Sequence, residues 1–152
     1  MAADQLIDDA IANKQIQQLD LTVFPAIFLY RQFIELFLKQ CILEFSQEEV
    51  DFKKLNHNLI AIWERFVKLM PPESKDDKKT FEAARKYIQE FNREDPNSFS
   101  FRYPINKSKE VIFDKERRIN IKHFKDRMAE LEEFLDFQYY QMSELEQNSD
   151  FF

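Results

Sequence analysis

The 152-residue sequence contains no glycine. Glycine is used where the backbone must pass close to a bound phosphate or adopt a positive φ angle. A P-loop, a dinucleotide-binding fingerprint, a kinase phosphate loop and a hydrolase nucleophile elbow all require it. The sharp turn of an EF-hand calcium loop requires it as well. The composition therefore excludes these nucleotide-binding, hydrolase and calcium-binding classes.

Metal-ligating side chains are also scarce. Cys41 is the only cysteine, and His57 and His123 are the only histidines. One cysteine cannot form an internal disulfide, and a zinc or iron–sulfur site needs several thiolate or imidazole ligands. We therefore expect no metal and no cofactor, and a reducing, cytoplasmic location.

No apolar run approaches the 18 or so residues of a membrane span. The first ten residues, MAADQLIDDA, have neither the basic start nor the apolar core of a secretory signal. No membrane association is expected.

Charge and hydrophobicity describe an acidic globular chain. The sequence is 44% hydrophobic and 33% charged, with 22 basic and 28 acidic residues and a net charge of −6. The length suits one domain, which we assign to residues 1–152. Because free-standing nucleic-acid binders are usually basic, any RNA contact would need a local basic patch. The 17 phenylalanines indicate a core built on this residue.

Apolar residues recur at helical spacing along most of the chain, which predicts an all-α, up-and-down bundle of four to five helices. Thr22 and Pro25 indicate the start of the second helix, with the proline in its first turn. Ser74 and Asp77 resemble a capping box, and Asn120 is expected to cap the last helix. The expected helices cover residues 4–19 (within an N-terminal segment 1–20), 22–45, 57–70, 74–92 and 120–145, with an extension and tail at 136–152.

Residues 98–113 break this pattern. The segment SFSFRY alternates Phe99, Phe101 and Tyr103 with small or charged residues, which predicts a short β-hairpin or an ordered loop. We expect Asn106 to take a left-handed turn position. Because prolines and asparagines end the helices, no turn is expected to need glycine.

A polar stripe interrupts the apolar helix at 22–45. Arg31, Glu35 and Lys39 are spaced four apart, which is typical of ion pairs on an exposed face. On a central helix the same stripe could instead face a cleft and meet His57 and Arg102. We expect that cluster mainly to position residues 95–104. A buried arginine needs a carboxylate, so we assign Glu35 or Asp95 to Arg102, and we expect His57 to cap or pack.

Two aromatic groups suggest binding surfaces. Arg102 and Tyr103 combine charge with a ring that could stack on RNA bases, although neighbouring acidic residues oppose this. The segment 136–152 would form an adhesive surface for a protein partner or a second copy if its rings are exposed. Its aromatic residues are Phe137, Tyr139, Tyr140, Phe151 and Phe152.

Three segments together resemble the HEPN superfamily of small prokaryotic α-helical domains. They are LYRQFIELFLKQCI at 29–42, HNLIAIW at 57–63, and DPNSFSFRYP at 95–104 followed by INIKHFKDRM at 119–128. The resemblance covers about residues 21–135. The family often has glycine before the histidine, where this chain has Asn56.

The resemblance implies a helical bundle that is often dimeric. Many members are metal-independent ribonucleases that act as toxins or phage-defence effectors, and others bind RNA, nucleotides or a protein partner without cleavage. The nuclease motif is arginine, four to six residues, then histidine. Here Arg118 and Arg117 stand at that spacing from His123, but Ile119 occupies a position that is usually polar. Histidine can move a ribose hydroxyl proton, and arginine can grip the phosphate.

Two functions follow. The first is an interaction module, expected to be homodimeric, that binds RNA, a nucleotide or a protein partner in a toxin–antitoxin or defence setting. The alternative is a metal-independent ribonuclease that uses Arg118 and His123 in a composite dimer site. With no glycine available, any bound phosphate would have to be held by a helix N-terminus or by arginines, with Arg102, Arg117 and Arg118 as the residues to test.

Overall fold

The computed structural model describes residues 2–12, 16–94 and 121–149, and within them it is an all-α helical bundle, as expected. No strand occurs in the described residues, and the predicted hairpin at 98–113 lies outside them. The described helices include one more than the expected five, because a short helix, α3, precedes α4. The helices are α1 (Ala2–Ala12), α2 (Ile16–Phe45), α3 (Phe52–Leu55), α4 (Leu59–Val67), α5 (Lys75–Glu94) and α6 (Ile121–Ser149).

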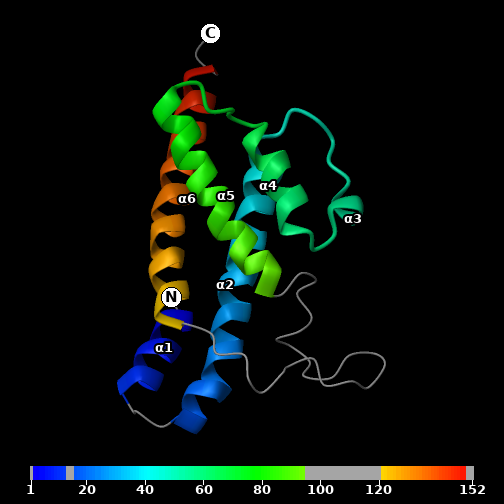
Figure 1. Ribbon diagram of the computed structural model, residues 1–152. Helices are drawn as coiled ribbons and strands as arrows, with labels where there is room; N and C mark the ends of the chain where they lie inside the picture. Colours follow the sequence, from blue (N-terminus) through cyan, green and yellow to red (C-terminus); the bar gives the residue numbers. More distant parts are fainter. Residues whose placement is uncertain (1, 13–15, 95–120, 150–152) are drawn as a thin grey trace.

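The helices are arranged around α2 (Figure 1). α1 folds back along the first half of α2, and α6 runs beside α2 in the same direction while α5 runs the opposite way. His57, which precedes α4, contacts Glu35 in the middle of α2, and Arg65 near the end of α4 contacts Glu48, which follows α2. α4 therefore runs parallel to α2, and the order is not strictly up and down. Residues 46–58 connect the end of α2 to the start of α4 and run back along the bundle (Figure 1).

The boundary between the first two helices differs from the prediction. α1 ends at Ala12 and α2 already begins at Ile16, so Pro25 lies inside α2 and not in its first turn. A proline inside a helix removes one backbone hydrogen bond. Pro25 is exposed, with its ring on the outer surface. Contacts between α2 and α1 outweigh the local preference of proline for the first turn of a helix. For example, Tyr30 donates a hydrogen bond of 2.6 Å to Asp4 of α1.

Side-chain caps determine where α4 and α5 begin. The capping box is confirmed, because the Ser74 N–H donates to Asp77 Oδ2 (3.2 Å) and the Asp77 N–H donates to Ser74 Oγ (3.0 Å). α4 is capped by Asn58, which accepts from the N–H groups of residues 60 and 61 at 3.1 Å. The assignment of His57 to the helix start is therefore wrong. α4 is also shorter than the expected 57–70.

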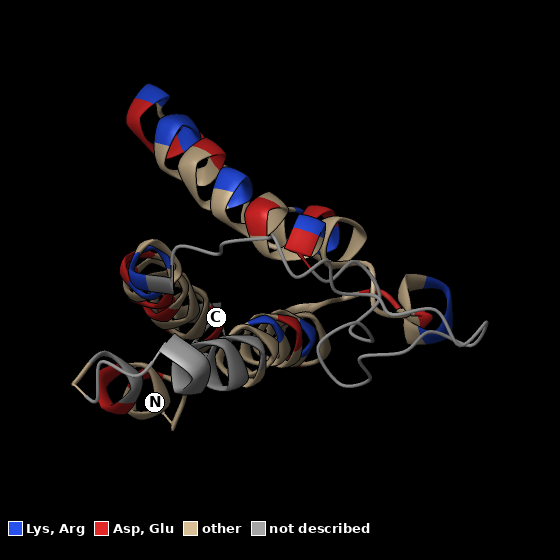
Figure 2. Ribbon diagram, turned by 60° about the horizontal axis from the view of Figure 1, so that its bottom comes forward, with Lys and Arg blue, Asp and Glu red and all other residues tan. Residues whose placement is uncertain are grey.

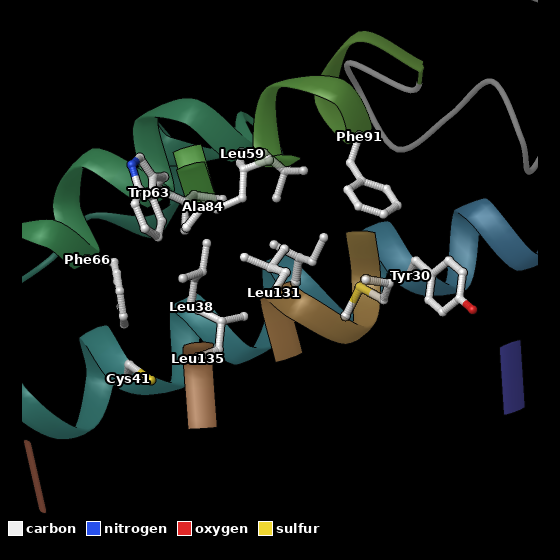
Figure 3. Packing of buried hydrophobic residues seen from close by; sticks show 14 of the residues in the cluster. Tyr30, Leu38, Cys41, Leu59, Trp63, Phe66, Ala84, Phe91, Leu131 and Leu135 are labelled. Atoms are coloured by element: carbon white, nitrogen blue, oxygen red, sulfur yellow. The ribbon is translucent and has the colours of Figure 1, made fainter. Parts of the chain in front are cut away.

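One hydrophobic core joins all helices except α3 (Figure 3). Trp63 is buried and stacks on Phe66 with ring centroids 5.5 Å apart. Isoleucine and leucine outnumber phenylalanine among the buried residues, so the expectation of a phenylalanine core is only partly met. Several phenylalanines border the core instead: Phe33, Phe37, Phe45, Phe52 and Phe134.

Charged residues cover the outside of α5, where Lys and Arg alternate with Asp and Glu (Figure 2). Residues 75–80 are all exposed, in agreement with the sequence pattern. None of the described helices has the length and apolar character needed to cross a bilayer.

Candidate functional site

A charge cluster lies on α2, and we call Arg31, Glu35, Lys39 and His57 the α2 charge cluster. Glu35 is its centre. Its Oε2 accepts from Arg31 Nη1 at 2.7 Å, and its Oε1 accepts from Lys39 Nζ at 2.7 Å and contacts His57 Nδ1 at 2.8 Å. The structure therefore brings three of the sequence-selected site residues together with Lys39 of the polar stripe.

The two central members of the cluster are removed from solvent. Arg31 is 0% exposed and Glu35 is 1% exposed. A buried charge is tolerated only when it is paired and hydrogen-bonded. The four-residue spacing on α2 supplies that pairing, because residues i and i+4 lie on one face of a helix. The interpretation of the polar stripe as ion pairs on an exposed helix face is therefore wrong for Arg31 and Glu35.

The cluster also holds the loop that leads into α4. Arg31 Nη2 donates to the carbonyl oxygen of His57, and Lys39 Nζ donates to that of Asn56 at 2.8 Å. Asn56 has φ 48° and ψ −125°, a conformation that favours glycine. The expectation that no turn needs glycine is therefore wrong at Asn56. Because Arg31 and Lys39 hydrogen-bond to this strained backbone, the cluster stabilises the loop before α4.

The carboxyl group of Glu35 stays ionised in this setting. Burial by itself raises its pKa, but hydrogen bonds from Lys39, Arg31 and His57 outweigh burial and lower the pKa below its ordinary value of 4.5. The cluster therefore combines two fixed positive charges and one fixed negative charge at neutral pH.

His57 is the outward-facing member of the cluster. Its side chain is 47% exposed, and Glu35 contacts Nδ1, which fixes the ring orientation. No described group bonds to Nε2. A carboxylate behind an exposed imidazole is an arrangement that can transfer protons, so His57 is the member of the cluster able to meet a ligand.

His123 lies in the first turn of α6, away from the α2 charge cluster. Its Nε2 is 2.8 Å from Glu90 Oε2 on α5, and its side chain is 38% exposed. Its ring meets the Phe124 ring edge-on at 5.9 Å. The described part of the chain thus pairs His123 with a carboxylate.

The other candidate residues fall outside the described residues: Asp95, Arg102, Tyr103, Arg117 and Arg118. Among the residues that the structure does describe, no three His, Cys, Asp or Glu side chains converge as a metal site would require.

The C-terminal aromatic residues divide into two groups. Phe137 and Tyr140 are 55% and 61% exposed. Tyr139 instead turns inward, where its hydroxyl donates to Glu44 at 2.9 Å and its ring packs edge-on against Phe45 at 5.4 Å. Tyr139 therefore belongs to the bundle and not to an adhesive surface, while Phe151 and Phe152 lie outside the described residues.

Sequence reasoning missed an exposed row of leucines on α2. Leu29, Leu36 and Leu43 are 37%, 58% and 71% exposed, so this apolar face of α2 is open to solvent. We call these three residues the α2 leucine ridge. Their spacing of seven, which places them on one helix face, was the available signal.

Comparison with known proteins leaves the family open. No protein-family model matches the chain, and neither characterised proteins nor solved structures yield a significant match.

Proposed function

We propose that this protein is a HEPN-like interaction module of the prokaryotic cytoplasm that forms a homodimer and binds RNA, a nucleotide or a protein partner in a toxin–antitoxin or phage-defence setting. The observation that carries the interaction function is the α2 leucine ridge. Exposed leucines on a chain that is 33% charged are costly unless another surface covers them. Asn56 supports the family resemblance, because it adopts a glycine-type conformation where HEPN proteins often have glycine.

The ridge suits a second copy of the chain. Gln32 and Gln40 flank the leucines on α2, and Lys39, the charged residue between Leu36 and Leu43, already donates to Glu35 and to the Asn56 carbonyl. Two copies of a chain with net charge −6 repel each other, and a face whose nearest charge is already paired favours close approach. A two-fold axis at Leu36 would place Leu36 against its counterpart and Leu29 against the counterpart of Leu43.

Sedimentation equilibrium tests the dimer. The wild-type chain should sediment as a dimer and the Leu36→Asp variant as a monomer with unchanged helix content. Leu145→Asp, at a residue of similar exposure on α6, should remain dimeric. A monomeric wild type at high micromolar concentration would refute the homodimer.

The ribonuclease remains a second candidate because of one observation. His123 keeps a partly exposed imidazole beside the Glu90 carboxylate, and such a carboxylate orients an imidazole that acts as a base. RNA cleavage and growth inhibition by the wild type, abolished by His123→Ala but retained by His57→Ala, would establish this function over the non-catalytic one. Absence of cleavage by the wild type would exclude it.

A further inference from the structure

A hollow of about 330 Å³ lies at the end of the bundle where α4 connects to α5. The 70–73 connection and the start of α5 form one wall, and the C-terminal half of α6 forms the other. It lies apart from the α2 charge cluster. Phe81, Phe137 and Leu145 line it together with Pro71, Pro72 and Gln138.

The hollow has both apolar and polar lining residues. Phe81 is 8% exposed and belongs to the hydrophobic core, whereas Phe137 and Leu145 are 55% and 61% exposed. Pro71 and Pro72 add rigid apolar surface opposite α6. An aliphatic or aromatic side chain placed in the hollow would therefore bury apolar surface that is now exposed to solvent.

One polar group in the lining has no partner. Gln138 is 6% exposed, and among the described residues nothing donates a hydrogen bond to its Oε1. An unsatisfied buried acceptor is destabilising. Because Gln138 lines the hollow, a backbone N–H of an incoming segment can satisfy this acceptor, so Gln138 suits a ligand with a peptide-like donor.

The rim of the hollow is negatively charged. Glu73 and Asp77 line it, and α6 contains no Lys or Arg after Arg127. Lys75, Lys78 and Lys79 lie on the first turns of α5 but do not line the hollow, and Lys79 pairs with Asp76. Asp136, Glu144 and Glu146 are the acidic residues of α6 that adjoin Phe137 and Leu145 in the sequence.

We propose that this hollow binds a short segment of a partner protein that carries one aliphatic or aromatic anchor flanked by Lys or Arg. The anchor fills the apolar floor, a backbone N–H meets Gln138, and the basic residues face the acidic rim. RNA is disfavoured because its phosphates are repelled by the same rim, and a second copy would bring the same negative charge. This inference rests on the proposed interaction function and narrows its ligand to a protein.

A phage-displayed library of random short peptides, selected on the full-length chain, tests the proposal. The enriched peptides should share an apolar anchor next to Lys or Arg. Fluorescence anisotropy with a labelled enriched peptide then measures affinity. We expect Phe137→Asp to weaken binding about tenfold or more, since burial of such a side chain contributes about 1.5–3 kcal/mol. Tyr140→Asp, at an equally exposed aromatic residue outside the hollow, should bind like the wild type.

Charge reversal gives a second readout. Glu73→Lys should weaken the same peptide and flatten the salt dependence of its affinity, because one attractive charge pair is replaced by repulsion. Should Phe137→Asp fail to fold, Leu145→Asp takes its place.

Three outcomes would overturn the proposal: no enrichment, enrichment of acidic peptides, or equal affinity of wild type and Phe137→Asp. Conversion of a wild-type dimer to monomer by Phe137→Asp would do the same, since a second copy would then occupy the hollow.

Sedimentation with Leu36→Asp separates the two hypotheses. Peptide binding by a monomeric wild type would refute the homodimer alone, and a dimer that binds no peptide would refute this inference alone.

Discussion

His57 Nδ1 lies 2.8 Å from Glu35 Oε1, across 22 residues of sequence. This contact joins the middle of α2 to the loop before α4. The same carboxylate also binds Arg31 and Lys39, and both of these donate to backbone carbonyls of that loop. One buried carboxylate thus orients an exposed imidazole and fixes the entry to α4.

Removal of the Glu35 charge should destabilise the fold strongly. Glu35→Gln removes the carboxylate that accepts from Nη1 of the fully buried Arg31 guanidinium. Breaking a buried ion pair in this way costs about 3–5 kcal/mol, so we expect the Tm to fall by roughly 10 °C. Differential scanning calorimetry measures it, with Glu48→Gln as control, since the exposed Glu48–Arg65 pair should matter little. Equal Tm values for both variants would contradict the role of the cluster.

The pKa of Glu35 predicts a dependence of stability on pH. Its native pKa lies below 4.5, so the unfolded chain takes up a proton there first. The contribution of Glu35 is fully present above about pH 4.5 and is lost as the pH falls through the native pKa. Urea unfolding of wild type and Glu35→Gln between neutral and acidic pH tests this. The difference in unfolding free energy should shrink at low pH, and a constant difference would count against it.

Asn56 should tolerate glycine better than alanine. Its φ of 48° costs an L-residue about 1–2 kcal/mol, and asparagine bears this cost better than alanine or valine. We expect Asn56→Gly to equal or exceed wild type in stability, and Asn56→Ala to lose about 1 kcal/mol, with Asn56→Val losing more. Chemical denaturation measures the series. Greater stability of Asn56→Ala than of Asn56→Gly would contradict the strained turn.

Cys41 should be unreactive in the native protein. It is 1% exposed, and burial raises its pKa to about 12, with the nearby Glu44 carboxylate adding to the rise. Very little thiolate then exists at pH 8, and the thiolate is the reactive form. A thiol reagent such as Ellman's reagent should label Cys41 only after denaturation. Rapid labelling of the native chain would indicate that α2 opens locally.

Local sequence signals predicted most of the helices. The apolar periodicity placed α5 and α6 within a few residues of their observed bounds, and the Ser74–Asp77 capping box was identified because both partners lie within one turn. The start of α2 was misplaced because Pro25, a common first-turn residue, lies inside this helix. Long-range packing against α1 outweighs that local preference.

The candidate site was predictable only in part. The spacing of Arg31, Glu35 and Lys39 indicated one helix face, but whether that face was buried depended on α4 and its preceding loop. The pairing of His57 with Glu35 required α4 to run parallel to α2, which no local pattern encodes. Tyr139 shows the converse, since its sequence context suggested an exposed ring and its contacts with Glu44 and Phe45 partly cover it.

By itself, the sequence determined the all-α class, the missing phosphate-binding loops and the Ser74–Asp77 cap of α5, because each depends on composition or on residues within one or two turns. The tertiary structure alone decided which charges are buried, which leucines remain exposed and where a hollow forms. Those properties depend on how segments far apart in the chain cover one another. Glu35 and Leu36 show this, because neighbours in sequence on one helix become a buried carboxylate and an exposed leucine.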